Sequence, residues 1–386
     1  MKRIAKWLIV VVALLLAAFF IFAPSLVDNA MNKTVGTTAR AGVAARGLHA
    51  DMLVADLHGD TLLWDRDLVE PSTRGHIDLP RMQAGNVALQ VFSSVSQTPW
   101  GQNYNSNPDS DNLWLLSIAQ QQPAATWFSP LGRTLYHSEK LRRAVRASNG
   151  HLMPIMTRGD VAALITARAH QERTTGVLFS VEGLQNLEGD FTNLDRLYRS
   201  GVRMAGLAHF FDNEVAGSMH GVRKGGLTPL GRRVVAEMER RGMIVDIAHS
   251  SHATVAEVLS LATRPVVSSH GGVQATCREN RNLSDDEIRG VARTGGVIGI
   301  GVWEGAVCST APRATARAMR HVRDLVGINH VALGSDFDGA TTVAYDVSRL
   351  DFITQALMDE GFSREEIRLA MGGNVLRVLG QALPER

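Results

Sequence analysis

The stretch that most constrains the fold is the short run at residues 51–55, which is followed by a closely spaced histidine and aspartate. The run is typical of a buried strand, because it is largely apolar and is stopped by polar residues and Gly59. His58 and Asp60 lie two positions apart, so in an extended chain both side chains point to the same side. Neutral imidazole and carboxylate both suit a divalent cation such as zinc. The alternative is a histidine that caps a turn beside a solvated aspartate.

Similar strand ends recur along the chain. Helical patterns lie between them, with marked starts at Thr228-Pro229 and at the capping box of Ser284 and Glu287. The eight predicted strands are 51–55, 87–95, 175–181, 201–208, 243–248, 264–269, 295–302 and 329–335. Strands of this kind, most of them followed by a helix, predict a (β/α)8 TIM-like barrel. The alternative is an open doubly wound sheet, in which the polar groups at so many strand ends would not meet.

The residues that follow these strands are histidines and acids, the side chains that bind divalent cations. Glu182 follows the third strand, His209 the fourth, His249 the fifth, His270 the sixth and Asp336 the eighth. Barrel enzymes carry their chemistry at this face, and buried imidazoles and carboxylates are costly to hold together without cations. We therefore expect one metal ion at the His58–Asp60 pair. A second is expected at His249 and His270, with Glu182 shared between the two. The alternative is a polar barrel mouth that arises by coincidence.

The first 27 residues form a separate segment. Lys2, Arg3 and Lys6 precede an uncharged apolar run that begins at Trp7 and continues to residue 27. At about 20 residues this run can span a bilayer. We expect an uncleaved anchor with its basic end inside and the domain on the exported side, periplasmic or extracellular. A cleaved secretory signal is the alternative, and it also exports the domain. Residues 28–48 are small and polar and predict a linker, which leaves 49–386 as the barrel domain.

Charge and cysteine content narrow the class of protein further. The formal net charge is +2 and no basic block recurs with aromatic spacing, so nucleic-acid binding has little support. Cys277 and Cys308 are the only cysteines, and in an exported protein they suggest one disulfide. Two buried free thiols are the alternative.

Two regions give weaker signals. Residues 96–150 predict a long surface excursion with helical pieces near 111–121 and 137–148. His220 lies in a Gly-rich loop after the fourth strand, and we expect it at the surface rather than in the pocket.

The strand ends belong to longer motifs, including Asp-Leu-His-Gly-Asp at 56–60, Val-Glu-Gly at 181–183 and Gly-Ser-Asp-Phe-Asp-Gly at 334–339. Further motifs lie at 76–85, 226–231, 242–249, 269–270, 281–283 and 373–378. In content and order, over roughly residues 48–382, these motifs resemble the renal (membrane) dipeptidase family of zinc peptidases.

The resemblance implies a role for each residue of the site. It implies that two Zn²⁺ ions per subunit are bound by His58, Asp60, Glu182, His249 and His270, with Glu182 bridging. It implies that His209 hydrogen-bonds the substrate carbonyl oxygen and that Arg281 grips the terminal carboxylate. Asp336 would take a proton from the bridging water and pass it to the leaving amine. Members of the family can carry a disulfide at the positions of Cys277 and Cys308.

The reaction expected from the resemblance is hydrolysis of free dipeptides by a metal-bridging hydroxide, with a D-residue tolerated at the second position. The chain departs from the family where Ala248 replaces a usual Ser, Gly271-Gly272 replaces a Ser-Asn type of pair, and Phe92-Ser93 replaces an aromatic pair. These positions line the expected pocket, so the preferred substrate side chains stay open.

Two other functions are weighed against this one. Another binuclear-metal barrel amidohydrolase (an amidase, lactonase or β-lactam hydrolase) usually opens with His-x-His, whereas this chain has His58 and Asp60. A tethered binding protein without catalysis would lack a ligand or Asp336, and none is missing. The expected partners are a dipeptide substrate and the membrane, and the sequence does not distinguish a monomer from a homodimer.

Overall fold

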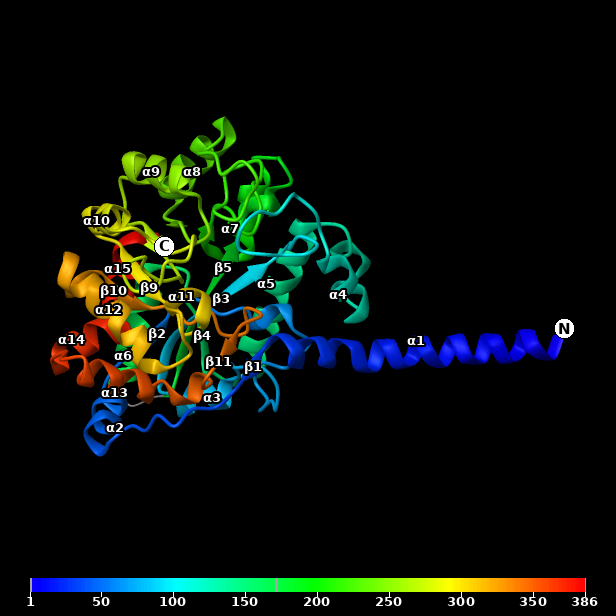
Figure 1. Ribbon diagram of the computed structural model, residues 1–386, viewed down its shortest axis with the longest axis horizontal. Coiled ribbons are helices and arrows are strands. Elements are labelled where there is room, and N and C mark those ends of the chain that lie inside the picture. The colour runs from blue at the N-terminus through cyan, green and yellow to red at the C-terminus, as the bar shows by residue number, and fades with distance from the viewer. Residues whose placement is uncertain (1, 171–172, 386) are drawn as a thin grey trace.

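The computed structural model describes residues 2–170 and 173–385, and at its centre is a closed ring of eight parallel strands (Figure 1). The ring strands are β2 (Val54–Asp56), β3 (Val87–Val95), β5 (Thr175–Glu182), β6 (Val202–Gly206), β7 (Ile244–Asp246), β8 (Val267–Ser268), β9 (Val297–Ile300) and β10 (Val331–Leu333). Their order is β3-β2-β10-β9-β8-β7-β6-β5, and the pairing of β3 with β5 closes the ring. The predicted TIM-like barrel is confirmed, and every predicted strand overlaps one strand of the ring.

The strands form because the chain buries them on both faces. In β5, Val177 and Phe179 belong to one apolar cluster and Leu178 belongs to another, so neither face of the strand meets water. A short strand that the sequence did not predict, β4 (Leu152–Pro154), pairs with the start of β5.

Helices surround the ring (Figure 1). They are α3 (Leu79–Ala84), α6 (Arg158–Ala169), α7 (Asn193–Ser200), α8 (Pro229–Arg241), α9 (His252–Leu261), α10 (Asp285–Arg293), α11 (Glu304–Val307), α12 (Pro312–Val326), α13 (Asp351–Asp359), α14 (Arg364–Arg368) and α15 (Asn374–Ala382). Their ends follow local signals, since the Thr228 hydroxyl caps α8 and Gly242 ends it with a left-handed φ of 70°. The residues 160–171 have the composition of a helix, and in the structure this helix begins at Arg158 because Thr157 caps it. Gln171 lies outside the described residues.

The excursion at 96–150 contains both expected helices. They are α4 (Leu113–Ala119) and α5 (Pro130–Ala147). Helix α5 starts earlier than the predicted 137–148, because Ser129 caps it and Pro130 occupies its first position.

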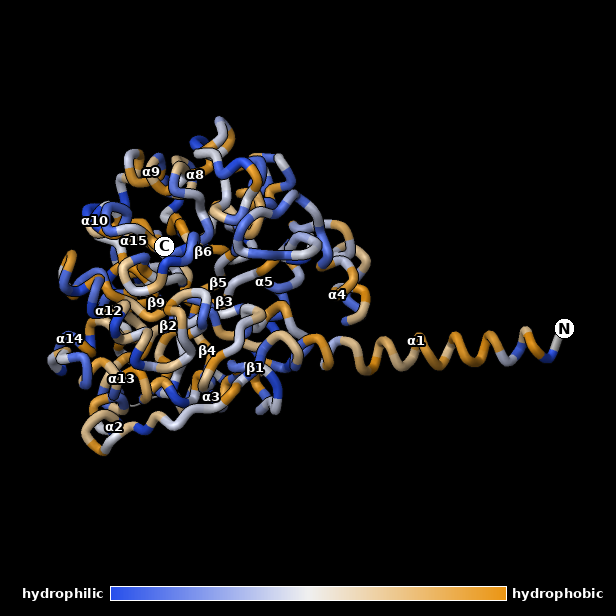
Figure 2. Tube along the Cα trace, in the orientation of Figure 1, coloured by the Kyte–Doolittle hydropathy of each residue, from blue (hydrophilic) through white to orange (hydrophobic). Residues whose placement is uncertain are grey.

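The N-terminal helix α1 (Lys2–Met31) projects from the barrel with its apolar residues exposed along most of its length (Figures 1 and 2). Among the described residues, it is the one helix long and apolar enough to cross a membrane. It contains Pro24 and continues beyond residue 27, where we expected the anchor to end.

Part of the segment expected as a linker packs on the barrel domain. Asp28 and Asn32 are buried, and β1 (Lys33–Thr34) pairs with β11 (Thr342–Val343). Helix α2 (Val43–Ala50) packs against α13. We call residues 28–34 the exit segment, because they lead from the apolar helix into the domain.

The two cysteines form one disulfide. The Cα atoms of Cys277 and Cys308 are 5.5 Å apart, and no free cysteine occurs in the part of the chain that the structure describes. The alternative of two free thiols is therefore wrong.

Removing this disulfide is expected to destabilise the domain without changing its fold. The pair is separated by 31 positions. In the chain-entropy model, closing a loop of this length contributes about 3–4 kcal/mol to the free energy of unfolding. Urea denaturation of the Cys277→Ser/Cys308→Ser variant, compared with the oxidised parent, measures the difference. An unchanged midpoint would contradict the expectation.

Candidate metal centre and active site

The predicted site residues meet at the carboxyl-terminal face of the barrel. Glu182 is the last residue of β5, and the others stand in the loops that directly follow β2, β6, β7, β8 and β10. The side chains brought together are His58, Asp60, Glu182, His209, His249, His270 and Asp336, each at most 5% exposed. Arg281, in the longer loop after β8, is also buried.

The carboxylate of Glu182 lies at the centre of this group. Its Oε1 is 3.0 Å from Nε2 of His249 and 3.2 Å from Nε2 of His270. The same oxygen is 3.6 Å from Nε2 of His58, and Oε2 is 3.4 Å from Nε2 of His209. One carboxylate therefore contacts imidazoles from four different strands of the ring.

A second carboxylate corner surrounds His58. Its Nε2 is 3.4 Å from Oδ2 of Asp60 and 3.9 Å from Oδ1 of Asp336. Three sets of side chains bring their ligand atoms within 4.8 Å of one another: His58, Glu182 and His270; Glu182, His209 and His249; and His58, Asp60 and Asp336. Each set could hold a metal ion.

Several buried polar atoms at this centre lack a hydrogen-bond partner among the described residues. They are both ring nitrogens of His58, Oδ1 of Asp60 and Nδ1 of His249. In addition, the Nε2 atoms of His249 and His270 face each other at 2.9 Å. Unpaired imidazole and carboxylate atoms are costly to bury, and a divalent cation suits both kinds. The donor set therefore fits metal ions.

The electrostatics also favour positive charge at this centre. Burial alone lowers the pKa of His58, but Asp60 and Glu182 outweigh burial and raise that pKa to about 10. Burial alone raises the pKa of Glu182, but His209 and His58 hold that pKa well below its usual value. Burial raises the pKa of Asp336 well above its usual value. His58 therefore keeps a proton in the metal-free site. A bound cation would balance the same negative charge of Asp60 and Glu182.

The backbone is strained at the site residues His249 and Asp336, and also at Asp338, two positions after Asp336. His249, Asp336 and Asp338 have φ values of 60°, 61° and 65°, in the left-handed region that residues other than glycine rarely adopt. Such conformations cost of order 1–3 kcal/mol each and persist where neighbours hold them. They aim the side chains of His249 and Asp336 at the centre.

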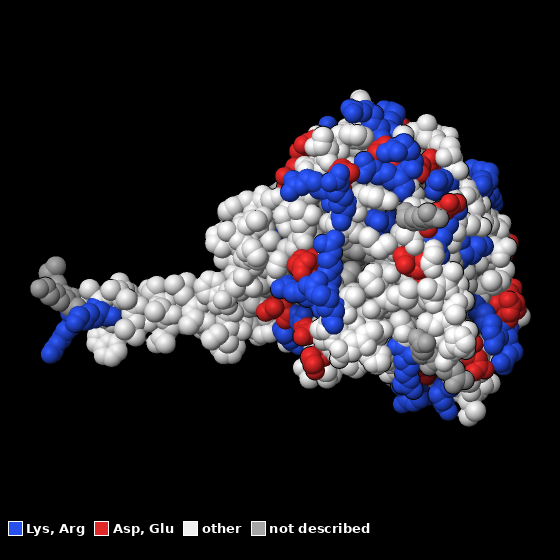
Figure 3. All heavy atoms as spheres, turned by 180° about the vertical axis from the view of Figure 1, so that it is seen from behind, with Lys and Arg blue, Asp and Glu red and all other residues white. Residues whose placement is uncertain are grey.

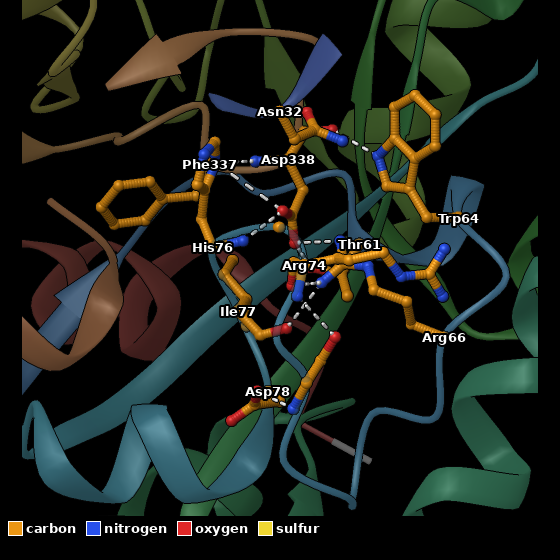
Figure 4. A network of polar contacts seen from close by, with 12 residues as sticks. Asn32, Thr61, Trp64, Arg66, Arg74, His76, Ile77, Asp78, Phe337 and Asp338 are labelled. Carbon is orange, nitrogen blue, oxygen red and sulfur yellow. Dashed lines mark hydrogen bonds and ion pairs between the residues drawn. The ribbon is translucent and has the colours of Figure 1, made fainter. Parts of the chain in front are cut away.

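A buried network holds Asp338 (Figure 4). Its Oδ2 accepts a hydrogen bond from the Thr61 hydroxyl at 2.7 Å and pairs with Nη2 of Arg66 at 2.8 Å. Its Oδ1 accepts from the backbone N–H of His76 at 2.6 Å, and the Trp64 indole donates to its carbonyl oxygen at 2.6 Å. Asp338 thus ties the loop that carries Asp336 to Thr61, Trp64, Arg66 and His76.

A cavity of about 930 Å³ lies over the centre, and Glu182, His209, His249, Arg281 and Asp336 line it. The Arg281 guanidinium lies over the Trp303 ring, 4.7 Å from its centroid, and its Nη2 is 3.4 Å from Nε2 of His249. The Nε of Arg281 has no partner among the described residues. A planar cation with a free donor at the edge of the centre is suited to a carboxylate.

His220 was wrongly expected at the surface. It is fully buried, stacks on Phe210 with ring centroids 4.6 Å apart, and lies 5.2 Å from the His249 ring. Its Nδ1 is 2.8 Å from the carbonyl oxygen of Tyr104, and burial lowers its pKa to about 3. His220 thus supports the wall beside His249, and only its position in a loop after a strand could have indicated this.

A closed parallel barrel with imidazoles and carboxylates gathered at its carboxyl-terminal face defines a barrel metallohydrolase. The sequence places the chain within that class. It belongs to the membrane dipeptidase family, peptidase family M19, whose sequence profile matches residues 43–384. The protein is therefore a metallodipeptidase that hydrolyses peptide bonds, and the family resemblance is confirmed.

Named relatives agree with this assignment. Dipeptidase verJ of Clonostachys rogersoniana is 36% identical over 79% of this chain and 75% of its own length. Dipeptidase aclJ of Aspergillus oryzae is 29% identical over 87% of this chain and 81% of its own length. Among solved structures, the dipeptidase AC, a metallopeptidase of the same family, is 25% identical with a TM-score of 0.70 over 86% of this chain and 98% of that one. A metallopeptidase from Rhodobacter sphaeroides is 23% identical and shares the fold, with a TM-score of 0.70 over 86% of this chain and 100% of that one.

Proposed function

We propose that the protein is a zinc-dependent dipeptidase with two Zn²⁺ ions per subunit. His58 and Asp60 would hold one ion, and His249 and His270 the other. Glu182 would serve both, and its short distances to imidazoles on both sides are the observation that carries the proposal. Imidazole and carboxylate ligands in this mixture suit zinc.

Three residues around the ligands would act on the substrate. The chemistry supplied at this site when zinc is bound is polarisation of the substrate carbonyl and activation of a water molecule. His209, with a proton on Nε2, would donate a hydrogen bond to the carbonyl oxygen as negative charge develops there. Arg281 would bind the terminal carboxylate. Asp336, whose pKa burial raises, is suited to accept the water proton and pass it to the leaving amine.

The substrate we propose is a free dipeptide, with a D-residue accepted at the second position. A fixed Arg281 beside the centre would restrict the peptide length by anchoring a free carboxyl terminus. The Rhodobacter sphaeroides relative was solved with a phosphinate mimic of the dipeptide L-Ala-D-Ala, which supports this substrate class.

A panel of L-L, L-D and D-L dipeptides, tested on the zinc-loaded full-length protein, examines the substrate directly. We expect turnover of L-L and L-D dipeptides and none of D-L dipeptides or of tripeptides. Equal turnover of tripeptides would contradict anchoring of the carboxyl terminus at a fixed distance.

We further propose that α1 is an uncleaved membrane anchor with its basic end inside and the barrel on the exported side. The exposed apolar length of α1 and the basic residues Arg3 and Lys6 near its start support this orientation.

Replacing the shared carboxylate is expected to remove metal and activity together. Glu182→Ala should lower the zinc content at both metal positions, because the His58–Asp60 pair and the His249–His270 pair lose the carboxylate they share. Glu182→Gln should weaken zinc binding less. Glu214→Ala changes an exposed glutamate and should behave as the parent. Metal analysis by mass spectrometry and a dipeptidase assay measure the outcome. An active, metal-free Glu182→Ala protein would refute the site.

Arg281→Ala is expected to raise KM for substrates with a free carboxylate by about tenfold to a hundredfold, as the loss of a charged hydrogen bond predicts. Dipeptide amides should be nearly unaffected. Arg278→Ala, which alters an exposed arginine in the same loop, is the matched control. Equal effects on acids and amides would exclude carboxylate binding by Arg281.

Metal uptake should be linked to protons. Because the pKa of His58 is about 10 in the metal-free protein, its imidazolium must lose a proton before the ring can bind a cation at pH 7. Zinc affinity should therefore rise with pH, by about tenfold per pH unit for each proton released. Calorimetry in two buffers of different ionisation enthalpy counts these protons. An affinity that is constant from about pH 6 to pH 8 would contradict the linkage.

A further inference from the structure

An uncharged arm lies beside the cavity, and the proposed reaction makes no use of it. No Asp, Glu, Lys or Arg occurs between Asp111 and Arg133, and we call residues 112–132 the uncharged arm. The arm contains α4 and carries Trp114, Trp127 and Phe128. In the space-filling view, the swelling beside the base of the projecting helix shows almost no charged atoms (Figure 3).

Apolar side chains of the arm and its neighbours are exposed. Phe128 is 73% exposed, Leu115 40% and, in the nearby loop, Trp100 53%. Trp114 packs on Phe128 with ring centroids 5.8 Å apart. Aromatic residues that are half buried at one end and exposed at the other are enriched where proteins meet the membrane interface.

The proposed anchor would place the arm at the depth of the membrane. Helix α4 contacts α1, and the cavity is lined by Phe19 and Ala23 of α1 together with Leu115 and Leu116 of α4. A bilayer core of about 30 Å takes about 20 helical residues, so a span that starts at Trp7 ends near residue 26. Phe19 and Ala23 then lie in the outer part of the span, and α4 lies beside them.

We propose that the uncharged arm inserts into the outer interfacial layer of the bilayer that α1 crosses. The partner is the lipid surface itself. The cavity over the metal centre then opens against that surface, and substrate reaches it along the membrane. This inference rests on the proposed anchor, and it adds a second attachment next to the site.

Single cysteines labelled with bimane test the arm in the full-length protein, because both native cysteines are in the disulfide. The protein is placed in phosphatidylcholine–phosphatidylglycerol vesicles that contain spin-labelled lipid. Leu14→Cys in α1 and Leu115→Cys in α4 should lose fluorescence. Leu261→Cys should keep it, because Leu261 is 47% exposed, against 40% for Leu115, and lies on α9, far from α1 in Figure 1.

The outcomes distinguish the proposed α1 anchor from insertion of the uncharged arm. If Leu14 is quenched and Leu115 behaves as Leu261 does, the anchor stands and the arm does not insert. If Leu14 itself is not quenched, the anchor fails and the inference fails with it.

A second inference comes from the polar contacts of the exit segment. Oδ2 of Asp28 is 3.1 Å from Nε of Arg66, the same arginine that pairs with Asp338. The Asn32 side chain donates to Oδ1 of Asp28 at 2.9 Å and accepts from the backbone N–H of Ala340 at 3.0 Å. Asp28, Asn32 and Arg66 are all buried.

These contacts end on the loop that carries Asp336. Asp336, Asp338 and Ala340 all have positive φ, at 61°, 65° and 58°. A loop with three such residues needs partners outside itself to hold it. We infer that Asp28 and Asn32 are positioning residues, which act on the site through Arg66 and the loop at 336–341. Cleavage after Ala30 would remove Asp28, so we expect such a product to be less active.

Full-length variants test this role. Asn32→Ala should lower kcat by about tenfold to a hundredfold with little change in KM, as expected for a misplaced catalytic group. It should also speed hydrogen–deuterium exchange in the peptide that contains 336–341, a readout that needs no activity. Asn29→Ala, which changes an exposed asparagine in the last turn of α1, should change neither. The exchanged pair Asp28→Asn/Asn32→Asp keeps one amide and one carboxylate in contact, and should recover part of the loss.

An Asn32→Ala protein with parental kcat and parental exchange would overturn the inference. So would a fully active enzyme, purified from the cells that express it, whose intact mass shows that it starts at residue 31 or later. If the parent itself hydrolyses no dipeptide, the proposed function fails, while the exchange data still decide whether Asn32 holds the loop.

Discussion

The structure depends on a single buried carboxylate that several strands share. Glu182 contacts imidazoles that follow β2, β6, β7 and β8. Strands β6, β7 and β8 are neighbours in the sheet, whereas β2 is separated from them and its end faces theirs across the closed ring. Burying so many titratable groups is unfavourable unless they are paired or bound to cations. The apolar clusters around the strands supply the stability that lets the barrel hold this unfavourable group in place.

The parts that the sequence predicted are those governed by short-range rules. A buried strand leaves its own signature, and the residue after it has a known face, so His58, Glu182 and His270 could be placed together without coordinates. Caps such as Thr228 likewise determine a helix end within four residues. Closure of the ring followed from the number of polar strand ends, and it is the strongest of the long-range predictions.

The parts that the sequence did not predict are long-range polar contacts. Asp28 pairs with Arg66, and Asn32 binds Ala340, more than 300 positions away. A small polar stretch with the composition of a linker has no hydrophobic periodicity that would indicate these contacts. The contact with Ala340 exists only once the loop at 336–341 has folded. His220 was misplaced for a related reason: its burial depends on Tyr104, from the irregular excursion, and on Phe210, at the start of its own long loop.

The place where α1 joins the barrel has a physical consequence for access to the site. Residues of α1 line the cavity over the metal centre, and β1 pairs with β11, which follows the loop that carries Asp336. The chain thus joins its apolar helix to the catalytic face and not to the opposite end of the barrel. With α1 as the proposed membrane anchor, the membrane would lie on the side of the barrel where the cavity opens. Substrate would then reach Glu182 from the layer of solvent next to the lipid.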